Sequence, residues 1–546
     1  MSVNGQTAVN GVITLETSTY KLVMDAATGG YTFTLKSNLL VSGEGENVAA
    51  LLQDGFSIVA QDGDGDPIAA PITLNVNVVD DVPVVTAGSD TIQVDEDDLP
   101  AGTDESKESL TVSGTIQDNA NWGADGFGGV VSVNGQTAVD GVITLETSTY
   151  KLVMNAATGG YDFTLKSNLL VAGEGENLAA LLQNGFSIVA QDGDGDPVAA
   201  PITLNVNVVD DVPVLVSATD TLNAVEDDNL AGGNNETDPP TASASGNLAD
   251  NINWGADGFG KLVSVNGVEA DEGGTITVIA SDGSWKLEVQ AASGDYTFTL
   301  LKPATHSDPS TENEFVTLSN SFAVVGEDKD GDAIDTNVTV KVDVYDDAPV
   351  MKSEFTPITA AVDEDALTGQ STGNADDSRP GETAGTNSAV ASGAAGALNA
   401  LVSVGADGPA SFSLKTQTPI DSGLDSKGAS VMIVSDGTTL HGYVNNGGGA
   451  GFDEGDREVF TLTVGSDGSY TFTLKDQIDH PSLNDANGDN TENLLATPLD
   501  LSGYVVATDA DGDKLTLAAG AFTVQVLDDI PVVILTEGAL QNDTGH

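Results

Sequence analysis

The sequence predicts an all-β protein: a tandem, elongated array of antiparallel β-sandwich domains. Three observations lead to this prediction, namely a long internal repeat, apolar residues that alternate with polar ones, and turn residues roughly every eight to twelve positions. Helical periodicity is nearly absent, apart from a short helical turn expected at residues 46–52.

The repeat sets the expected domain boundaries. Residues 2–83 recur almost unchanged at 132–213, and more diverged copies follow. Each copy keeps three landmarks in order: Tyr-x-Phe-Thr-Leu, then Asp-x-Asp-Gly-Asp, then Asp-Asp-x-Pro. We therefore expect unit 1 at 1–83, truncated at its N-terminus, unit 2 at 84–213, unit 3 at 214–349, a longer unit 4 with an insertion at 350–531, and a tail or the start of a further repeat at 532–546.

Strands are predicted from a period of two. In the stretch ITLNVNVV at 72–79, Ile72, Leu74 and Val76 share one face, which is typical of a half-buried antiparallel strand. Turn sequences such as VNGQ and SDGSY supply the Asn, Asp and Gly residues that positive φ angles favour. Many short strands at this spacing indicate sandwiches of the immunoglobulin or cadherin type.

Charge limits the possible partners. The chain of 546 residues has 84 acidic and 17 basic side chains and a net charge of −67, so nucleic acid and anionic membrane surfaces are excluded as partners and cations are favoured. There is no cysteine, so neither disulfides nor thiolate sites stabilise the domains, and bound metal is the expected substitute. No apolar run approaches the roughly 20 residues of a membrane span. We expect a monomeric, elongated segment without direct membrane insertion.

The aspartates are predicted to meet at the junctions between units. About a dozen residues separate Asp66 from Asp80, which is roughly 40 Å of strand, so one ion cannot bridge both within one domain. The proline after the Asp-Asp pair keeps each linker extended and semi-rigid. The linker of one unit should therefore meet the Asp-x-Asp-Gly-Asp loop of the next, so that the expected ligand groups are Asp80 and Asp81 with Asp192, Asp194 and Asp196; Asp210 and Asp211 with Asp328, Asp330 and Asp332; and Asp346 and Asp347 with Asp509, Asp511 and Asp513.

Half-sites and weaker candidates complete this set. Asp62, Asp64 and Asp66, and likewise Asp528 and Asp529, would each lack a partner unit. Asp118 and Asn119 are expected at the junction that holds Asp192, and the stretch VDEDD at 94–98 at the opposite pole of its unit. The stretch 484–493 forms either a separate calcium loop or an ordinary polar turn.

Calcium is the expected ion. It takes six to eight hard oxygen ligands, which aspartates provide, whereas zinc and copper prefer His and Cys, and magnesium requires a stricter octahedron. Four carboxylates about 5.5 Å apart would repel one another by up to about 18 kcal/mol at an effective dielectric constant of ~20, before solvent screening. Acidic turns kept for solubility would explain the charge, but not the constant spacing of the motif in all four copies.

Other chemistry has little support in the sequence. His306, His441 and His480 stand in different contexts, so we expect loop-packing or solvent-facing roles, no metal cluster and no catalytic triad. Trp122 and Trp254 are expected to pack in the core, although an exposed tryptophan could stack on a sugar. We expect no enzymatic activity.

Unit 4 resembles a known family. The stretches LDSKGASVMIVSDGTTLHGYV, REVFTLTVGSDGSYTFTL, VVATDADGD and FTVQVLDDIPVV, in this order, are similar to the tandem repeats of giant type I secreted RTX-class adhesins of Gram-negative bacteria. Two family hallmarks, a run of Gly-Gly-x-Gly-x-Asp nonapeptides and a C-terminal secretion region, are not evident.

The resemblance implies a function. The chain would be an extracellular, calcium-rigidified extender on the bacterial cell surface that projects a distal binding region for attachment and biofilm formation. The alternative is a ligand-binding adhesion module for a glycan or a protein, with residues 405–465 of unit 4 as the candidate site.

Overall fold

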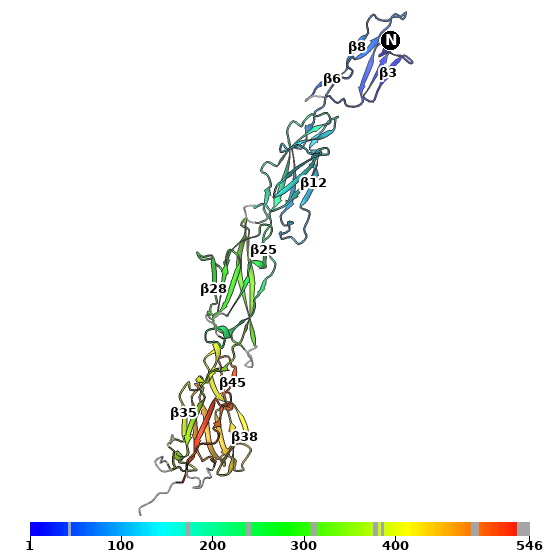
Figure 1. Ribbon diagram of the computed structural model, residues 1–546. Coiled ribbons are helices and arrows are strands. Elements are labelled where there is room, and N and C mark those ends of the chain that lie inside the picture. Colours follow the sequence, from blue (N-terminus) through cyan, green and yellow to red (C-terminus); the bar gives the residue numbers. More distant parts are fainter. Residues whose placement is uncertain are drawn as a thin grey trace, which may run out of the picture.

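The computed structural model shows four β-sandwich bodies joined end to end in a long array (Figure 1). It describes residues 1–41, 45–170, 175–235, 242–306, 314–374, 381–383, 387–481 and 491–531. Four separate hydrophobic cores occur, one in each predicted unit. The helices in the described ranges are single 3₁₀ turns, so the all-β prediction is confirmed. The expected further unit at 532–546 lies outside the described residues.

Unit 2 shows the complete sandwich. One sheet has the strand order β11-β20-β19-β14, with β18 also on β20, and the facing sheet has the order β12-β17-β16-β15. The short strands β10 and β13 pair beside them. The elements are β10 (Val84–Val85), β11 (Ser89–Asp95), β12 (Thr111–Thr115), η1 (Gln117–Asn119), β13 (Ala120–Asn121), β14 (Phe127–Val133), β15 (Val142–Glu146), β16 (Tyr150–Asn155), β17 (Gly160–Leu165), β18 (Leu178–Ala180), β19 (Phe186–Asp192) and β20 (Ile202–Val209).

One strand pair in each complete unit is parallel. In unit 2 the first long strand, β11, runs parallel to the last, β20, from Ser89 opposite Thr203 to Asp95 opposite Val209. The same pairing joins β22 and β23 to β32 in unit 3, and β34 to β46 in unit 4. The other pairs are antiparallel, as predicted. Alternating burial is the same in both kinds of ladder, so the sequence pattern could not reveal this pair.

Unit 1 has a similar half of the fold. Its sheets have the orders β2-β1-β7-β8 and β3-β4-β5, and β6 pairs with β9. Residues 46–52, where the sequence suggested a helical turn, contain β6 instead, because Val48 and Ala50 pair with Val79 and Asn77. The strands are β1 (Ser2–Val3), β2 (Gln6–Thr7), β3 (Val12–Glu16), β4 (Tyr20–Asp25), β5 (Tyr31–Leu35), β6 (Val48–Ala50), β7 (Phe56–Val59), β8 (Ile72–Leu74) and β9 (Asn77–Val79).

Unit 3 repeats the arrangement with longer strands. Its elements are β21 (Val214–Leu215), β22 (Thr219–Thr221), β23 (Val225–Glu226), η2 (Asp227–Asn229), β24 (Ser243–Asn247), η3 (Ala249–Asn251), β25 (Ile252–Asn253), β26 (Phe259–Val265), β27 (Val268–Glu269), β28 (Thr275–Ile279), β29 (Trp285–Gln290), β30 (Asp295–Leu300), β31 (Phe315–Asp328) and β32 (Ala333–Tyr345). Trp254 is 7% exposed and Trp122 of unit 2 is 8% exposed, and each indole donates to a backbone carbonyl. Both are core residues, as predicted.

Unit 4 has two more strands in one sheet, which has the order β35-β42-β41-β40-β39-β38. The added hairpin is β38–β39. The elements are β33 (Val350–Met351), β34 (Ile358–Asp363), η4 (Glu364–Ala366), β35 (Val390–Gly393), η5 (Leu398–Ala400), β36 (Val402–Ser403), η6 (Gly405–Asp407), β37 (Ser411–Leu414), β38 (Gln417–Ser426), β39 (Ala429–Ser435), β40 (Thr439–Val444), β41 (Arg457–Val464), β42 (Tyr470–Leu474), β43 (Leu499–Asp500), η7 (Ser502–Tyr504), β44 (Val505–Thr508), β45 (Lys514–Thr516) and β46 (Phe522–Leu527).

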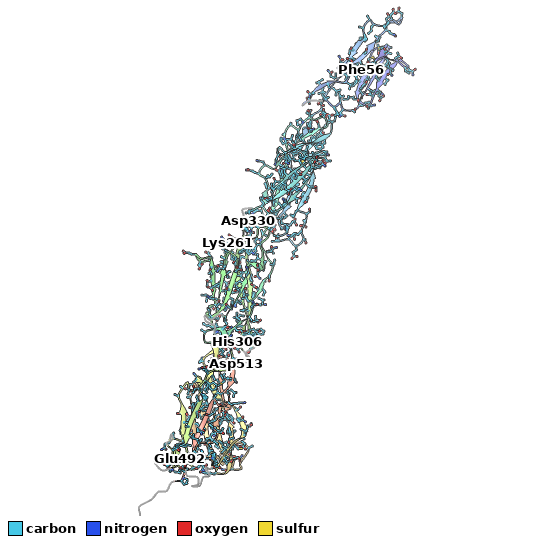
Figure 2. The ribbon with its side chains drawn as sticks, viewed as in Figure 1. Phe56, Lys261, His306, Asp330, Glu492 and Asp513 are labelled. Atoms are coloured by element: carbon cyan, nitrogen blue, oxygen red, sulfur yellow. The ribbon has the colours of Figure 1, made fainter. Side chains whose placement is uncertain are left out.

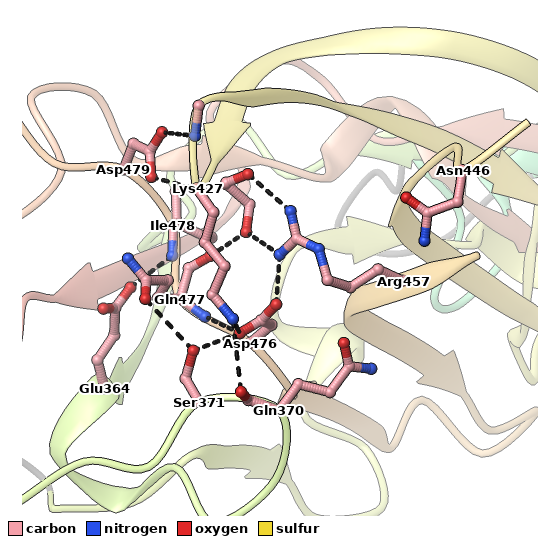
Figure 3. Close-up of polar contacts among 12 residues, drawn as sticks. Glu364, Gln370, Ser371, Lys427, Asn446, Arg457, Asp476, Gln477, Ile478 and Asp479 are labelled. Carbon is pink, nitrogen blue, oxygen red and sulfur yellow. Dashed lines mark hydrogen bonds and ion pairs between the residues drawn. The ribbon is translucent and has the colours of Figure 1, made fainter. Parts of the chain in front are cut away.

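A buried carboxylate holds the turn of this hairpin. Asp476, whose side chain is fully buried, forms ion pairs with Arg457 of β41 and with Lys427 in the turn, and accepts a hydrogen bond from Ser371 (Figure 3). Arg457 also donates to the hydroxyl and the carbonyl of Ser426 at the end of β38. Burial raises the pKa of Asp476, but the contacts with Lys427, Ser371 and Arg457 outweigh it, so the pKa lies below its usual value.

Candidate metal centres at the unit junctions

The Asp-x-Asp-Gly-Asp loop closes on itself in the same way in every copy. In unit 2, Asp192 Oδ1 accepts hydrogen bonds from the backbone N–H groups of Gly195 and Asp196, at 3.2 and 2.8 Å. Gly195 has a φ of +114°, which other residues rarely adopt. The matching bonds in the other units are those of Asp62, Asp328 and Asp509. The Oδ1 atom of the first aspartate thus holds the loop in shape, and its Oδ2 atom takes no part in these hydrogen bonds.

The second aspartate of each linker binds the next unit. Asp81 Oδ2 accepts from the backbone N–H of Ala124 at 2.9 Å, and Asp211 and Asp347 accept likewise from Ala256 and Ala406. Each of these donor loops has the sequence Gly-Ala-Asp-Gly. Its first glycine, Gly123 in unit 2, has a φ of +67°, and a Cβ there would collide with the Asp81 carboxylate.

At the junction of units 1 and 2, Asp80 lies with Asp194 and Asp196, with ligand atoms all within 4.8 Å of one another. The backbone N–H groups of Val41 and Gly45 in unit 1 donate to Asp194 and Asp196, at 3.1 and 2.9 Å. The two units thus contact each other through the carboxylates that the strand lengths predicted to meet.

The junction of units 2 and 3 has the same arrangement, with Asp330 at the boundary in Figure 2. Asp210 of the linker lies with Glu96 and Asp257, with ligand atoms within 4.8 Å, and all three are buried. Gly175 of unit 2 donates to Asp332 of unit 3 at 2.6 Å. Glu96 belongs to the stretch VDEDD, which was expected at this pole.

The junction of units 3 and 4 contains a histidine. His306 and Asp513 lie at this boundary in Figure 2, and His306 groups with Asp346 and Asp511. His306 is 5% exposed, and its Nδ1 lies 3.2 Å from Asp346 Oδ1. His306 packs in a loop, one of the two roles expected for the histidines, but it does so beside carboxylates, which the sequence did not indicate. His480 is placed similarly, since its Nδ1 lies 3.5 Å from Asp528 Oδ1.

The half-sites differ in exposure. Asp62, Asp64 and Asp66 lie together but are all exposed. Asp528 lies with Glu364 and His480 at the far end of unit 4, and Asp529 accepts from Asn374 at 2.9 Å. The stretch 484–493, predicted as either a calcium loop or a turn, lies outside the described residues except at 491–493.

The structure gives the pair Asp118 and Asn119 other surroundings. Asp118 is exposed, while Asn119 is buried and donates to the carbonyl of Ala87 at 3.1 Å. That part of the chain reaches the junction through Asp125 instead, which accepts from Asn38 of unit 1 at 2.7 Å. Metal binding by Asp118 and Asn119 stays a prediction.

Two acidic positions lie at the junctions although the sequence did not assign them clearly. One was not predicted at all, and the other was predicted only as part of a longer acidic stretch. The aspartate of Gly-Ala-Asp-Gly lies at each junction as Asp125, Asp257 or Asp407. Its recurrence two positions after the first, positive-φ glycine of the motif (Gly123, Gly255 and Gly405) was the available signal. The acidic residue after the first long strand, Glu96, Asp227 or Glu364, aligns in three units and was noted only as the stretch VDEDD.

The junctions hold carboxylates in an unfavourable environment. Burial, followed by the charges of neighbouring aspartates, raises the pKa of Asp210 to about 7 and that of Asp407 to about 8. Burial raises the pKa of Glu96 to about 8, although Leu169 N–H opposes it. Such raised pKa values mean that bound protons or cations stabilise these clusters near neutral pH.

Many carboxylate oxygens at the junctions are buried and have no hydrogen-bond partner in the described part of the chain. They belong to Asp80, Asp192, Asp194 and Asp196; Glu96, Asp210, Asp257 and Asp328; and Asp227, Asp346, Asp407, Asp509 and Asp511. A buried charge without a partner is costly, so these oxygens fit a bound cation. Hard, mostly negative oxygen donors from several loops suit calcium.

Comparisons with known proteins add little. A family model described as "Domain of unknown function (DUF5801)" matches residues 359–519. None of the curated proteins matches the chain. Among solved structures, the chain is similar to a Ca²⁺-stabilized adhesin from an Antarctic bacterium that binds ice, with 13% identity, coverage of 95% of this chain and 89% of that one, and a TM-score of 0.20.

Cadherin ectodomains show the same low similarity. The human desmocollin-1 ectodomain is 11% identical over 92% of this chain and 75% of its own, with a TM-score of 0.19. Drosophila N-cadherin EC1-4 is 10% identical over 89% and 93%, with a TM-score of 0.20. Scores this low support no inference, so the fold class rests on the strand pairing above. Within the described ranges, no helix has the length and apolar character needed to cross a membrane.

Proposed function

We propose that the chain is a calcium-rigidified extender segment of a bacterial surface adhesin. The observation that carries the proposal is the convergence of linker and loop carboxylates at three successive junctions, with buried oxygens that lack partners among the described residues. Calcium would occupy these clusters and hold each linker against the next unit. Because the units are joined end to end, holding the junctions straight keeps the whole array extended (Figure 1).

The filled junctions would make the chain stiff and would not provide catalysis. Four sandwiches of roughly 40 Å each would span about 150 Å when the junctions are straight. Such a segment would project a distal binding region for attachment and biofilm formation. An extracellular location and type I secretion belong to the same proposal, which the resemblance of unit 4 to RTX-class adhesin repeats supports.

Small-angle scattering tests the extender directly. The full chain should have its largest maximum dimension with calcium, and a shorter or more variable one after chelation. An unchanged maximum dimension and an unchanged melting temperature after complete removal of calcium would refute the proposal.

No specific observation supports the alternative, a ligand-binding module at residues 405–465. These residues form strands β37 to β41 of two sheets, and a cavity of unit 4 is lined by residues 366–370, 387–390 and 473–475 instead.

A further inference from the structure

His306 presents one ring nitrogen to the carboxylates between units 3 and 4. Its Nε2 lies 3.0 Å from the carbonyl oxygen of Val344 in β32. A carbonyl only accepts hydrogen bonds, so Nε2 carries a proton in this contact. In the neutral ring, Nδ1 therefore holds the lone pair, and it points into the junction at the opposite side of the imidazole.

Nδ1 faces three carboxylates from three different elements. It lies 3.2 Å from Asp346 Oδ1 in the linker, 3.7 Å from Asp511 Oδ2 in the loop of unit 4, and 3.9 Å from Asp227 Oδ2 in η2. The side chain of His306 is 1% exposed, and Nδ1 has no hydrogen-bond partner within the described ranges. A lone pair among carboxylates is repelled unless a proton or a metal ion lies between them. Burial lowers the pKa of His306, but the Val344 carbonyl and the neighbouring carboxylates outweigh it and raise that pKa, so Nδ1 holds either a second ring proton or a cation.

The first junction has no such nitrogen. Val41 occupies the matching position there, because its backbone N–H donates to Asp194 as the N–H of His306 donates to Asp511. Val41 is buried and apolar, so the side chain at this position adds no donor at that junction. His480 occupies the position in unit 4, but its two nitrogens lie 2.8 and 3.1 Å from the carbonyls of Ile478 and Val526. Its ring is therefore engaged on both sides.

We propose that His306 Nδ1, Asp346 and Asp511 bind one zinc-class transition-metal ion at the junction of units 3 and 4. Imidazole nitrogen suits zinc, whereas calcium takes oxygen ligands. Zinc bonds of about 2.0–2.1 Å in a tetrahedron place ligand atoms roughly 3.4 Å apart, which is the scale of the Nδ1–carboxylate separations. The Nε2–H bond to Val344 is the outer contact that orients a metal-bound histidine.

This site takes Asp346 and Asp511 from the third of the carboxylate clusters that the proposed function gives to calcium, so zinc would replace calcium at this one junction. Calcium can occupy the first two junctions, which offer only oxygen ligands, whether or not zinc binds at His306. Conversely, zinc can bind at His306 in a chain whose length does not respond to calcium. The two proposals therefore fail separately.

Zinc titration of the full chain in saturating calcium tests the site. The wild type should bind one zinc ion at least tenfold more tightly than His306→Val, since losing even an outer-shell partner costs about 10–100-fold in affinity. His306→Val installs the residue that unit 1 has at this position. The control is His441→Val, which removes a histidine beside a single carboxylate, that of Glu458, and should leave zinc affinity unchanged. Equal zinc affinity in the wild type and His306→Val, or a loss with His441→Val alone, would overturn the proposal.

Nitrogen NMR of the wild-type chain provides a test that needs no variant. The sequence has four histidines, so ring-nitrogen signals can be assigned. Zinc should shift Nδ1 of one histidine while its Nε2 keeps its proton. The proposal would be overturned if the His306 ring kept protons on both nitrogens as zinc was added, or if a large excess of calcium abolished the zinc-induced shift of Nδ1.

Discussion

Tyr31 and Tyr161 occupy the same position in two nearly identical repeats, yet Tyr31 is 54% exposed and Tyr161 is 4% exposed. The difference arises because β12 covers Tyr161 in unit 2, while β5 of unit 1 has no such neighbour in the described structure. Leu35 and Ile72 are likewise 42% and 57% exposed, against 1% and 0% for Leu165 and Ile202. The same sequence therefore forms a poorly covered core in unit 1.

Unit 1 should be stabilised by supplying the covering strands. Placing a copy of residues 84–131 before residue 2 would reproduce the layout of unit 2. Burying the exposed halves of Leu35 and Ile72 alone should contribute about 1.5–3 kcal/mol. We expect much slower hydrogen exchange in β5 and β8 of the extended chain. A scrambled copy of 84–131 is the control, and equal exchange with both copies would contradict the prediction.

Asp80→Asn should weaken the first junction. It removes charge from a buried carboxylate whose Oδ2 has no partner in the described structure, so calcium should bind this junction more weakly and units 1 and 2 should bend more freely. Calcium titration and scattering of the variant would measure both effects. Asp54→Asn is the matched control, since Asp54 is exposed and unit 2 has Asn184 at this position. Identical calcium response in the two variants would argue against Asp80 as a ligand.

The metal-free chain should lose stability as pH rises. The pKa values of Glu96, Asp227 and Asp407 are raised to about 8, mainly by burial, from ordinary values near 4. Between about pH 4 and 8 the folded state thus binds more protons than the unfolded state, so its free energy of unfolding falls with pH. Calcium replaces these protons, and the gain in melting temperature that it gives should grow with pH.

Melting curves with chelator and with calcium at several values from pH 5 to 8.5 would check this. Asp407→Asn should flatten the pH dependence of the metal-free chain, because an amide does not titrate. A metal-free melting temperature that rises through this window would contradict the raised pKa values.

Arg457→Met should destabilise unit 4 by about 3 kcal/mol. The change leaves the buried Asp476 carboxylate with only part of its compensating charge, and removing one member of a buried pair is costly. Calorimetry would show an earlier transition for this unit. Lys21→Met is the control: its pair with Glu16 is 43% exposed on both sides, so the effect should be within about 1 kcal/mol. Equal losses of stability in Arg457→Met and Lys21→Met would mean that the ion pair with Arg457 does not stabilise the buried Asp476 carboxylate.

Strand length and repeat order were enough to predict which aspartates approach one another. The distance between Asp66 and Asp80 along the chain implied opposite poles, and Asp80 does lie beside Asp194 and Asp196. Whether they bind metal is untested. Asp257 was missed because it follows a tight turn at Gly255, whose direction depends on a positive φ angle. The place of His306 at a junction could not be predicted because the copies differ in loop length, so its match to Val41 emerges only from their shared backbone contact.

The parallel pair of β11 and β20 also determines how a unit bears tension. The chain enters unit 2 at one pole, just before β11, and leaves at the other, just after β20. A pull on the two ends would slide these neighbouring strands past each other and load the rungs from Ser89 to Asp95 together, instead of opening them one by one from an end. Each complete unit has this geometry, so the array should resist mechanical unfolding under tension as well as being long.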